Sequence, residues 1–451
     1  MTAFTSCNPA TAEVVFTRPA WPEPRFADCL AALRQAQRRW AALDIHERAG
    51  QLLRLAEGLE AEREALAALV TLEVGKRTAE CLAEIDKSAQ LIRYYADLAP
   101  SLLAPQAIAT QASDSGVSFE PLGCVLAVMP WNYPIWQVLR FAVPALMAGN
   151  ACLVKPAPSV PQCTQLLLEL VRTAGLDCLD VAWIDHEQVE EAIRHSDAVA
   201  FTGSTQTGRV IASLAGKHLK KTVLELGGSN PFIVLADADV DTAAQEAVNS
   251  RFRDAGQSCN AAKRMIVVPE IADRFIAAFV EAASRLQPGD PRDPAATLAP
   301  LTRADLREAL HAQVMDAVHG GATVLLGGQM PATPGFFYPA TVLDHVSAAC
   351  RVYHEEVFGP VASILRARDE ADAIRLANDT PFGLGASIYT ADETRGRALA
   401  RQLEVGSVFI NRHTSSDLRL PFGGVKASGY GRELSEFGLY EFVNVKTYWQ
   451  K

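Results

Sequence analysis

The stretch "CVLAVMPWNYPIWQVLRFAVPALMAGNACLV" (residues 124–154) decides the fold. It begins with a short apolar strand over 124–129, continues as a helical segment over 135–148, and ends in a second apolar strand over 151–154. Short apolar strands that alternate with helices are typical of a parallel sheet with helices on both faces. The alternation continues through expected strands at 181–184 and 198–201 and expected helices at 161–174 and from about 207. The sequence therefore predicts an α/β fold.

The chain on either side of this unit forms two further blocks. Residues 27–100 carry apolar side chains at three- and four-residue spacing, which predicts helices. From about 228 to 427, a second alternation predicts another α/β domain. Its expected strands are "PFIVL" (231–235), "RMIVV" (264–268), "ATVLL" (322–326), "PVASIL" (360–365) and "GSVFI" (406–410). We expect two α/β domains in tandem.

Composition and charge limit the class of protein. A net charge of −10 over 451 residues argues against a nucleic-acid-binding surface. The nine cysteines form no CxxC pair, so reduced thiols in a cytoplasmic protein are expected. The most apolar window, 124–149, contains three prolines together with Asn132 and Arg140, so we expect no membrane span. The first residues lack a basic start followed by an apolar core, and we expect no signal peptide.

Two turns that follow strands could hold a phosphorylated ligand. "FTGSTQTG" (201–208) joins a strand to a helix, where glycines allow close backbone approach and free N–H groups attract an anion. A tight turn without a ligand explains this stretch equally simply. "KPAPSVP" (155–161) places Lys155 at the carboxyl end of a strand, the edge at which open α/β sheets bind ligands. Its alternative is a solvated lysine before a proline-rich turn.

Three other motifs carry groups suited to covalent chemistry. "PWNYP" (130–134) ends a strand with Asn132, whose amide can donate to a developing oxyanion or simply stabilise a turn. "LELGGSNP" (224–231) places Glu225 in an apolar strand, where it is either a general base with a raised pKa or an ion-paired structural residue. "GQSC" (256–259) puts Cys259 in a loop, as a buried structural thiol, a nucleophile or part of a cysteine–histidine hydrolase.

The ordered set of motifs resembles the aldehyde dehydrogenase superfamily. The set comprises PWNYP, KPA, FTGS, ELGG, GQSC, "EEVFGP" (355–360) and "PFGGVKASGYGRE" (421–433), and it covers nearly the whole chain. The resemblance implies a Rossmann-type NAD(P)-binding domain, an α/β catalytic domain and a small oligomerisation element. The corresponding ranges are 1–102 and 122–227 for the first, 228–427 for the second, and 103–121 and 428–451 for the third.

The resemblance also implies roles for individual residues. Cys259 matches the nucleophile, Glu225 the general base, and Asn132 the amide that holds the oxyanion together with the Cys259 backbone N–H. The expected NAD or NADP site comprises Trp131, Lys155, Pro158, Gly203, Ser204, Leu226, Glu356 and Phe358. No metal is implied. The expected partners are a small aldehyde substrate and further copies of the chain, in a homodimer or homotetramer.

Arg253, six residues before Cys259, separates this sequence from relatives that act on uncharged aldehydes, in which that position is often aromatic. Arg140, also expected in the substrate tunnel, is likewise often apolar there. Two buried guanidinium groups are costly unless they bind an anion, and they suit a carboxylate. With Ser416 as a further donor, this set resembles the carboxylate anchor of the short bacterial succinate-semialdehyde dehydrogenases. The alternative for the arginines is charge on a helix surface.

Two departures and several alternatives qualify this expectation. Many relatives that prefer NAD carry a glutamate where this chain has Pro158, so nothing here repels the 2′-phosphate of NADP. Some succinate-semialdehyde dehydrogenases carry a second cysteine where this chain has Ala261, so a redox-switch disulfide is not expected.

Glutarate semialdehyde and an uncharged aliphatic aldehyde remain as alternative substrates. A non-catalytic relative of the same fold would be expected to have lost Cys259, Glu225 or Asn132, and all three are present.

Overall fold

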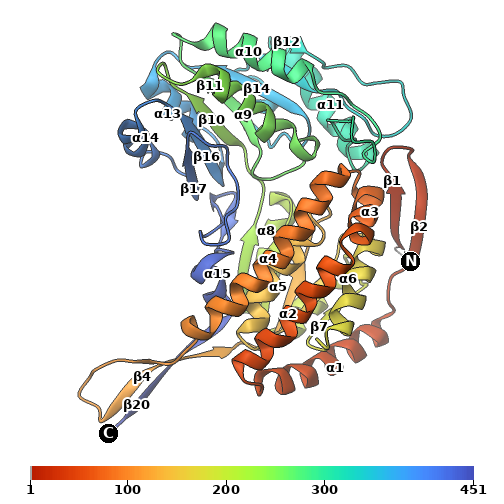
Figure 1. Cartoon of the computed structure of the whole chain (residues 1–451), viewed down its shortest axis with the longest axis vertical. Coiled ribbons are helices and arrows are strands. Elements are labelled where there is room, and N and C mark those ends of the chain that lie inside the picture. Colours follow the sequence, from red (N-terminus) through yellow and green to blue (C-terminus); the bar gives the residue numbers. More distant parts are fainter. Residues whose placement is uncertain (1–2) are drawn as a thin grey trace.

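Residues 124–155 fold as the expected strand, helix and strand in the computed structural model, which describes residues 3–451. These elements are β5 (Cys124–Val128), α5 (Trp136–Met147) and β6 (Ala151–Lys155), and β5 and β6 pair in parallel. All twelve residues of α5 are buried, because the helix is enclosed between the sheet and an outer layer of helices. Figure 1 shows this unit at the centre of the lower of two lobes.

The lower lobe is built on a six-stranded sheet in the order β19-β9-β8-β5-β6-β7. Its strands besides β5 and β6 are β7 (Leu179–Val181), β8 (Ala198–Thr202), β9 (Lys221–Glu225) and β19 (Gly429–Tyr430), and its helices besides α5 are α6 (Pro161–Thr173), α7 (Val189–His195) and α8 (Thr205–Lys217). All neighbours pair in parallel except β19, which is antiparallel to β9. The chain reverses direction across the sheet between β5 and β8, and such a switch point opens a ligand crevice at the carboxyl ends of the strands.

The first hundred residues form helices, as their apolar spacing predicts. They are α1 (Glu23–Ala41), α2 (Ile45–Ala61), α3 (Arg63–Val74) and α4 (Thr78–Leu102), preceded by the hairpin of β1 (Ala3–Asn8) and β2 (Glu13–Pro19). The first of these helices packs on β5, β6 and β7, and the others form an outer layer over α5 and α6. Helix α2 begins at Asp44, whose side chain accepts the His46 N–H in a capping box with Glu47. Helix α4 packs on both α2 and α5, which brings it to the boundary between the two lobes.

The upper lobe is built on a seven-stranded sheet in the order β12-β13-β14-β11-β10-β16-β17. The strands are β10 (Asn230–Val234), β11 (Ala262–Val267), β12 (Thr323–Leu326), β13 (Thr341–Asp344), β14 (Val361–Arg366), β16 (Gly385–Tyr389) and β17 (Ser407–Ile410). Only the edge strand β12 runs antiparallel. Ile233 packs on one face of the sheet while Phe232 and Val234 pack on the other, so successive residues of β10 serve two separate cores.

Helices cover both faces of the upper sheet. They are α9 (Val240–Phe252), the 3₁₀ turn η1 (Arg253–Gly256), α10 (Ala272–Ser284), α11 (Ala304–His319), α12 (Arg351–His354), α13 (Glu370–Asn378) and α14 (Glu393–Ala400). The short pair of β15 (Phe382–Gly383) and β18 (Val425–Lys426), followed by α15 (Ser435–Tyr440), leads the chain back to the lower lobe.

A long antiparallel ribbon projects from the lower lobe (Figure 1). It consists of β4 (Asp114–Pro121) and β20 (Val443–Gln450), with β3 (Gln106–Ala107) at its edge. The expected ranges 103–121 and 428–451 include this ribbon, but the second range also contains β19, which belongs to the six-stranded sheet. None of the helices within residues 3–451 is long and apolar enough to cross a membrane.

The α/β fold is confirmed, and several expected strands needed adjustment. The strand expected at 181–184 is β7 at 179–181, and the strand expected at 322–326 is the antiparallel edge rather than a parallel member. Strands β13 and β16 were not expected. The domain boundaries drawn from the sequence stay a prediction.

Candidate active site

The loop that carries Cys259 has an unusual backbone. Helix α9 ends at Phe252, and Asp254, Ala255 and Gly256 then adopt positive φ angles of 52°, 52° and 71°. Non-glycine residues with positive φ are strained and tend to occur where the surrounding structure holds them for a functional reason. Here the Asp254 N–H donates to Glu80 Oε1 at 3.1 Å, and the hydroxyl of Tyr133 donates to the Asp254 carboxylate. The lower lobe therefore holds this turn of the upper lobe in place.

The backbone carbonyl of Cys259 is also held. It accepts Lys263 Nζ at 2.7 Å and Asn230 Nδ2 at 3.2 Å. Burial raises the pKa of the Cys259 thiol to about 11, with Lys263 and Arg140 opposing the shift and two carboxylates adding to it. The thiol is consequently protonated at neutral pH in this structure, and its use as a nucleophile requires a group that takes the proton.

Glu225 is a candidate for that group. It is the last residue of β9, its side chain is buried, and neither carboxyl oxygen has a hydrogen-bond partner within residues 3–451. Burial raises its pKa well above the usual value, and the nearby Glu433 raises it further, whereas Arg140 and Arg432 lower it. An unpartnered buried carboxyl group is costly, so its retention points to chemistry rather than to stability.

Asn132 lies beside the cysteine loop, in the turn after β5. Its side chain is buried, and its amide Nδ2 donates to the carbonyl of Gln257 at 2.9 Å, two residues before Cys259. The amide thus lies close enough to the nucleophile's loop to serve as a donor there. To hold an oxyanion it must exchange its present bond to Gln257.

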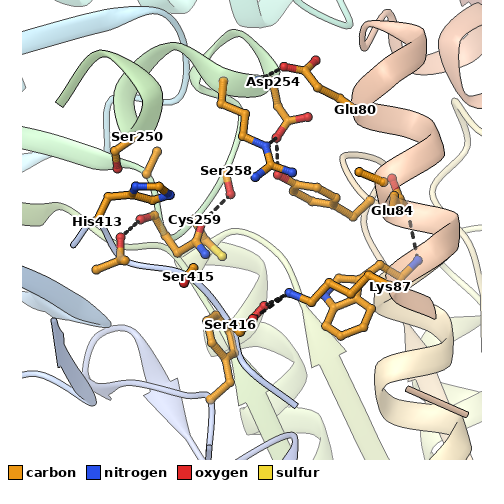
Figure 2. A pocket seen from close by; sticks show the side chains of 18 of the residues that line it. Glu80, Glu84, Lys87, Ser250, Asp254, Ser258, Cys259, His413, Ser415 and Ser416 are labelled. Atoms are coloured by element: carbon orange, nitrogen blue, oxygen red, sulfur yellow. Dashed lines mark hydrogen bonds and ion pairs between the residues drawn. The ribbon is translucent and has the colours of Figure 1, made fainter. Parts of the chain in front are cut away.

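One cavity of about 110 Å³ brings the expected substrate residues together with Cys259. Arg140, Arg253 and Ser416 all line it, and Figure 2 shows Cys259 above Ser416 on the same side of the cavity. Neither Asn132 nor Glu225 lines this cavity. Asn132 donates a hydrogen bond to the Cys259 loop, and Glu225 raises the pKa of the Cys259 thiol. The structure therefore groups residues that lie up to 276 positions apart in the sequence, from Arg140 to Ser416.

The two arginines of the cavity have different surroundings. Arg140 is buried, forms an ion pair through Nε with Glu433, and lies over the Phe422 ring. Its Nη2 is buried without a hydrogen-bond partner in the described part of the chain. The side chain of Arg253 is 54% exposed, and its Nε lies 3.6 Å from Asp254 Oδ2. Neither arginine is an isolated buried charge, but Arg140 keeps a free donor and Arg253 is accessible.

Several charged residues of this site had no role in the sequence analysis. Glu433, the last residue of the PFGG motif, pairs with Arg140 and raises the pKa of Glu225. Lys263 Nζ also contacts Glu356 Oε1 at 3.1 Å. Lys87 of α4 lines the cavity and reaches Ser416. Glu433 could have been noticed in its motif, whereas Lys87 carries no local signal because it is one charged residue in a long helix.

The expected cofactor residues gather at the carboxyl edge of the lower sheet. Ser204 caps α8 by accepting the Thr207 N–H at 3.2 Å, which leaves N–H groups of the first helical turn available to an anion. A Cβ at Gly208 would lie 2.4 Å from Leu226, and one at Gly203 would lie 2.6 Å from Phe201. A side chain at either position would therefore have to displace Leu226 or Phe201.

The remaining cofactor residues come from both lobes. Lys155 is buried at the end of β6, where burial lowers its pKa, and Pro158 lies exposed in the following turn. Trp131 and Phe358 meet edge to face with ring centroids 5.9 Å apart. Glu356 Oε1 accepts the Gly228 N–H at 3.1 Å, so this carboxylate bridges to the loop after Glu225. No group of three histidine, cysteine or acidic side chains within residues 3–451 is arranged to hold a metal.

Comparison with known proteins agrees with this arrangement. The aldehyde dehydrogenase family model matches residues 1–448. A succinate semialdehyde dehydrogenase [NAD(P)+], Sad, of Escherichia coli (strain K12) is 44% identical, over 99% of this chain and 97% of the relative. A succinate-semialdehyde dehydrogenase [NADP(+)] of Deinococcus radiodurans is 42% identical, over 98% of this chain and 94% of the relative.

A solved structure extends the similarity to the fold. The succinic semialdehyde dehydrogenase of Streptococcus pyogenes, crystallised in complex with NADP+, superposes with a TM-score of 0.96 at 36% identity, and the match covers 99% of each chain. The family model, the full-length relatives and the shared fold agree with the thiol, carboxyl and amide groups gathered around one loop. This chain belongs to the aldehyde dehydrogenase family.

Proposed function

We propose that this enzyme oxidises succinate semialdehyde to succinate with NAD or NADP. The observation that carries the proposal is the cavity that opens on Cys259 and is lined by Arg140, Arg253 and Ser416. The guanidinium and hydroxyl donors that line this cavity suit a carboxylate, and the thiol suits an aldehyde carbon. The names of the two bacterial relatives at 44% and 42% identity support the same substrate.

The reaction uses Cys259 twice. Glu225 takes the thiol proton, and the sulfur adds to the aldehyde carbon to give a thiohemiacetal oxyanion. Asn132 Nδ2 and the Cys259 N–H donate to that oxygen. Loss of the hydride leaves a thioester on Cys259. Glu225 releases the thiol proton to solvent and then, as a carboxylate, deprotonates the water that attacks the thioester, and the displaced Cys259 thiolate takes up a proton as the carboxylic acid leaves. The raised pKa of Glu225 suits it to both proton transfers.

The nicotinamide cofactor supplies the acceptor for the hydride when it is bound. The residues present fit such a group, because glycines allow close approach at the turn before α8 and the first helical turn offers free N–H donors. Lys155 and Glu356 would bind the two riboses. Gly203 and Ser204 would face the pyrophosphate, while Trp131, Leu226 and Phe358 would pack against the cofactor.

Pro158 bears on the choice between the two nucleotides. It lies exposed in the turn after β6, three residues beyond Lys155, and it carries no charge. A carboxylate at this place would repel a 2′-phosphate, and its absence lets the site accept NADP as well as NAD. The Streptococcus pyogenes enzyme, whose structure contains NADP+, supports the use of NADP in this fold.

The ribbon of β4 and β20 supports self-association. Ile108, Val445 and Trp449 on and beside it expose 49%, 56% and 56% of their surface, and apolar side chains on a projecting ribbon favour contact with another protein surface. We infer that the ribbon joins two or four copies of the chain. All nine cysteines are unpaired, which supports a reducing, cytoplasmic compartment.

One observation favours a second candidate, an uncharged aliphatic aldehyde. Arg140 already pairs with Glu433, so its burial alone does not require an anionic substrate. A cysteine hydrolase is less well supported, because within residues 3–451 no hydrogen bond joins Cys259 to His413, the histidine that lines the cavity, and His413 is not among the main groups that shift the pKa of the Cys259 thiol.

A substrate screen of the purified enzyme tests the proposal. Succinate semialdehyde, glutarate semialdehyde and butanal are compared at saturating NAD and at saturating NADP by the formation of reduced nucleotide. We expect the highest kcat/KM with succinate semialdehyde, since its carboxylate can bind the cationic side chains that line the cavity. A higher value with butanal would favour the uncharged aldehyde, and no nucleotide reduction with any of the three would overturn the proposed activity.

A further inference from the structure

Lys87 is a cation of the substrate cavity that the proposed chemistry does not use. It lies in the middle of α4, a helix of the lower lobe, and its side chain extends toward the loop between β17 and β18 of the upper lobe (Figure 2). The side chain is only partly buried and lines the same cavity as Cys259. It is therefore accessible from the space in which the substrate would bind.

The ammonium group of Lys87 is directed at Ser416. Nζ donates to the Ser416 hydroxyl oxygen at 2.5 Å and to the Ser416 carbonyl at 2.8 Å, and it lies 4.5 Å from the Trp136 ring centre. Because the hydroxyl oxygen accepts from Lys87, its own proton remains free to donate to another group. An ammonium group has three donors, and these two bonds leave one for a ligand.

Lys87 also differs from the arginines of the cavity in its charge balance. Arg140 pairs with Glu433, and Arg253 lies beside Asp254. No carboxylate of residues 3–451 lies within 4.0 Å of the Lys87 ammonium. The two glutamates of α4 that line the cavity have partners of their own. Glu84 pairs with Lys76, and Glu80 pairs with Arg77. Lys87 thus supplies positive charge that the protein does not neutralise.

We propose that Lys87 is a specificity-determining residue of the cavity where the substrate carboxylate binds. It orients the Ser416 hydroxyl toward the substrate. It also supplies an unneutralised positive charge to the substrate carboxylate. The inference rests on the proposed function, because it assumes a carboxylate-bearing aldehyde. It adds a fourth group to Arg140, Arg253 and Ser416. Lys87 of α4 and Arg140 of α5 belong to the lower lobe, and Arg253 and Ser416 belong to the upper lobe.

The ionisation of Lys87 agrees with this placement. Burial lowers its pKa to about 8, and Arg140 and Arg253 lower it further, while Asp417 raises it. Asp417 itself pairs with Arg419, so little of its charge is left for Lys87. A bound carboxylate would stabilise the ammonium form. In the free enzyme, Lys87 loses its charge as the pH rises through about 8.

The test compares two aldehydes that share a four-carbon chain, succinate semialdehyde and butanal, in wild type and Lys87→Met. Loss of a charge-assisted contact is expected to lower kcat/KM for succinate semialdehyde about tenfold or more, chiefly through KM. Butanal should change less than about twofold, since it has no carboxylate to lose. Lys87→Arg, which keeps the charge, should recover most of the loss. Lys217→Met removes a surface cation at the end of α8 and should affect neither substrate.

The pH profile separates a charge role from a structural one. In wild type, the ratio of kcat/KM for succinate semialdehyde to that for butanal should fall as the pH rises above about 8, and in Lys87→Arg it should stay level. Ionisation of Cys259 changes kcat/KM for both substrates by the same factor, so it does not change the ratio. If Lys87→Met does not fold, Lys87→Gln takes its place in the same comparison.

The possible failures are distinguishable. A wild-type enzyme that does not prefer succinate semialdehyde to butanal would overturn the proposed function. Alternatively, wild type prefers succinate semialdehyde, while Lys87→Met either keeps that preference or loses kcat/KM equally on both substrates. In that case Lys87 has no role in specificity, and only this inference is overturned.

Discussion

Cys259 is a thiol whose surroundings oppose its ionisation. Burial raises its pKa to about 11, and the carboxylates of Glu356 and Glu225 act in the same direction. An enzyme that keeps its nucleophile protonated until the substrate is bound protects it from stray electrophiles, because the thiolate is the reactive form. In this account the proton leaves only when Glu225 can accept it.

The first prediction concerns the reactivity of this thiol. In the absence of nucleotide, alkylation of Cys259 by iodoacetamide should be slow at pH 7 and should rise about tenfold per pH unit toward pH 11, because only the thiolate reacts. Mass spectrometry of the peptide that contains Cys259 measures the rate separately from the other cysteines. A rate that levels off below pH 8 would show that the thiolate is stabilised in the free enzyme.

Glu225 leads to a second prediction. Glu225→Gln keeps the shape of the side chain but cannot accept a proton, so both the formation and the hydrolysis of the thioester should become slower. At neutral pH no rapid burst of reduced nucleotide should precede the slow turnover, whereas a burst should appear as the pH is raised toward 11, where the Cys259 thiol ionises without Glu225. Stopped-flow absorbance at the two pH values records the difference. Steady-state turnover equal to that of wild type would place the base elsewhere.

The candidate site was predictable from sequence only where a motif marks the residue. Cys259, Glu225 and Asn132 stand in recognisable motifs, and the structure brings them to one loop. Lys87 and Arg140 lie on different helices and meet only through the packing of α4 on α5. The ion pair between Arg140 and Glu433 was also unforeseen, because partners 293 positions apart leave no local pattern.

At the scale of the element, the turn η1 is the feature that directs Cys259 into the cavity. Gly256 has φ 71°, and a Cβ there would lie 2.4 Å from the carbonyl oxygen of Gly359 and from Arg251 Nη2. A backbone oxygen cannot move aside as a flexible side chain can. The turn is therefore intolerant of any side chain at this position.

Gly256→Ala is the third prediction. It should lower kcat/KM at least about tenfold and lower Tm, because the Cys259 loop must shift to relieve the contact. Activity assays and thermal unfolding measure the two effects. Gly216→Ala is the control, since that helical glycine has nothing within 4 Å of its added Cβ and alanine favours a helix. Equal behaviour of the two variants would contradict the role given to the turn.

Strand prediction succeeded where apolar β-branched residues run together. The strands β5, β6, β8, β10, β11 and β14 read as apolar runs because both faces of a parallel sheet are buried. Strand β16, "GASIY", is equally buried but is rich in small residues, and its position between β10 and β17 is set by tertiary pairing. A short strand of this kind has no periodicity to distinguish it from a loop.

At the scale of the whole molecule, the ribbon of β4 and β20 projects from the lower lobe (Figure 1). Val445 and Trp449 of β20 are each 56% exposed, although the ribbon itself is fully paired through eight residue partners with β4. A ribbon that is regular but uncovered is expected to pack against another copy.

Val445→Asp is the fourth prediction. It should shift the enzyme to a smaller assembly, because a carboxylate cannot be buried unpaired at an interface. Light scattering after size exclusion measures the mass. Val14→Asp, at an exposed valine of β2, is the matched control and should leave the mass unchanged. If wild type is already monomeric, or if both variants keep its mass, the ribbon is not the contact.

The central claim is that this member of the aldehyde dehydrogenase family recognises a carboxylate through the cationic side chains that line its cavity. Arg253 tests it most directly, because its side chain is accessible and lies beside Asp254, whereas Arg140 pairs with Glu433 and lowers the pKa of Glu225. A charge-assisted contact contributes about 1.5–3 kcal/mol, which corresponds to about ten- to a hundred-fold in rate.

The decisive measurement is the ratio of kcat/KM for succinate semialdehyde to that for butanal, in wild type and in Arg253→Leu. The account predicts a ratio well above one in wild type and a fall of about ten- to a hundred-fold in the variant, with butanal nearly unaffected. An unchanged ratio, or equal losses on both aldehydes, would show that Arg253 is structural and would contradict the assignment of a carboxylate-bearing substrate.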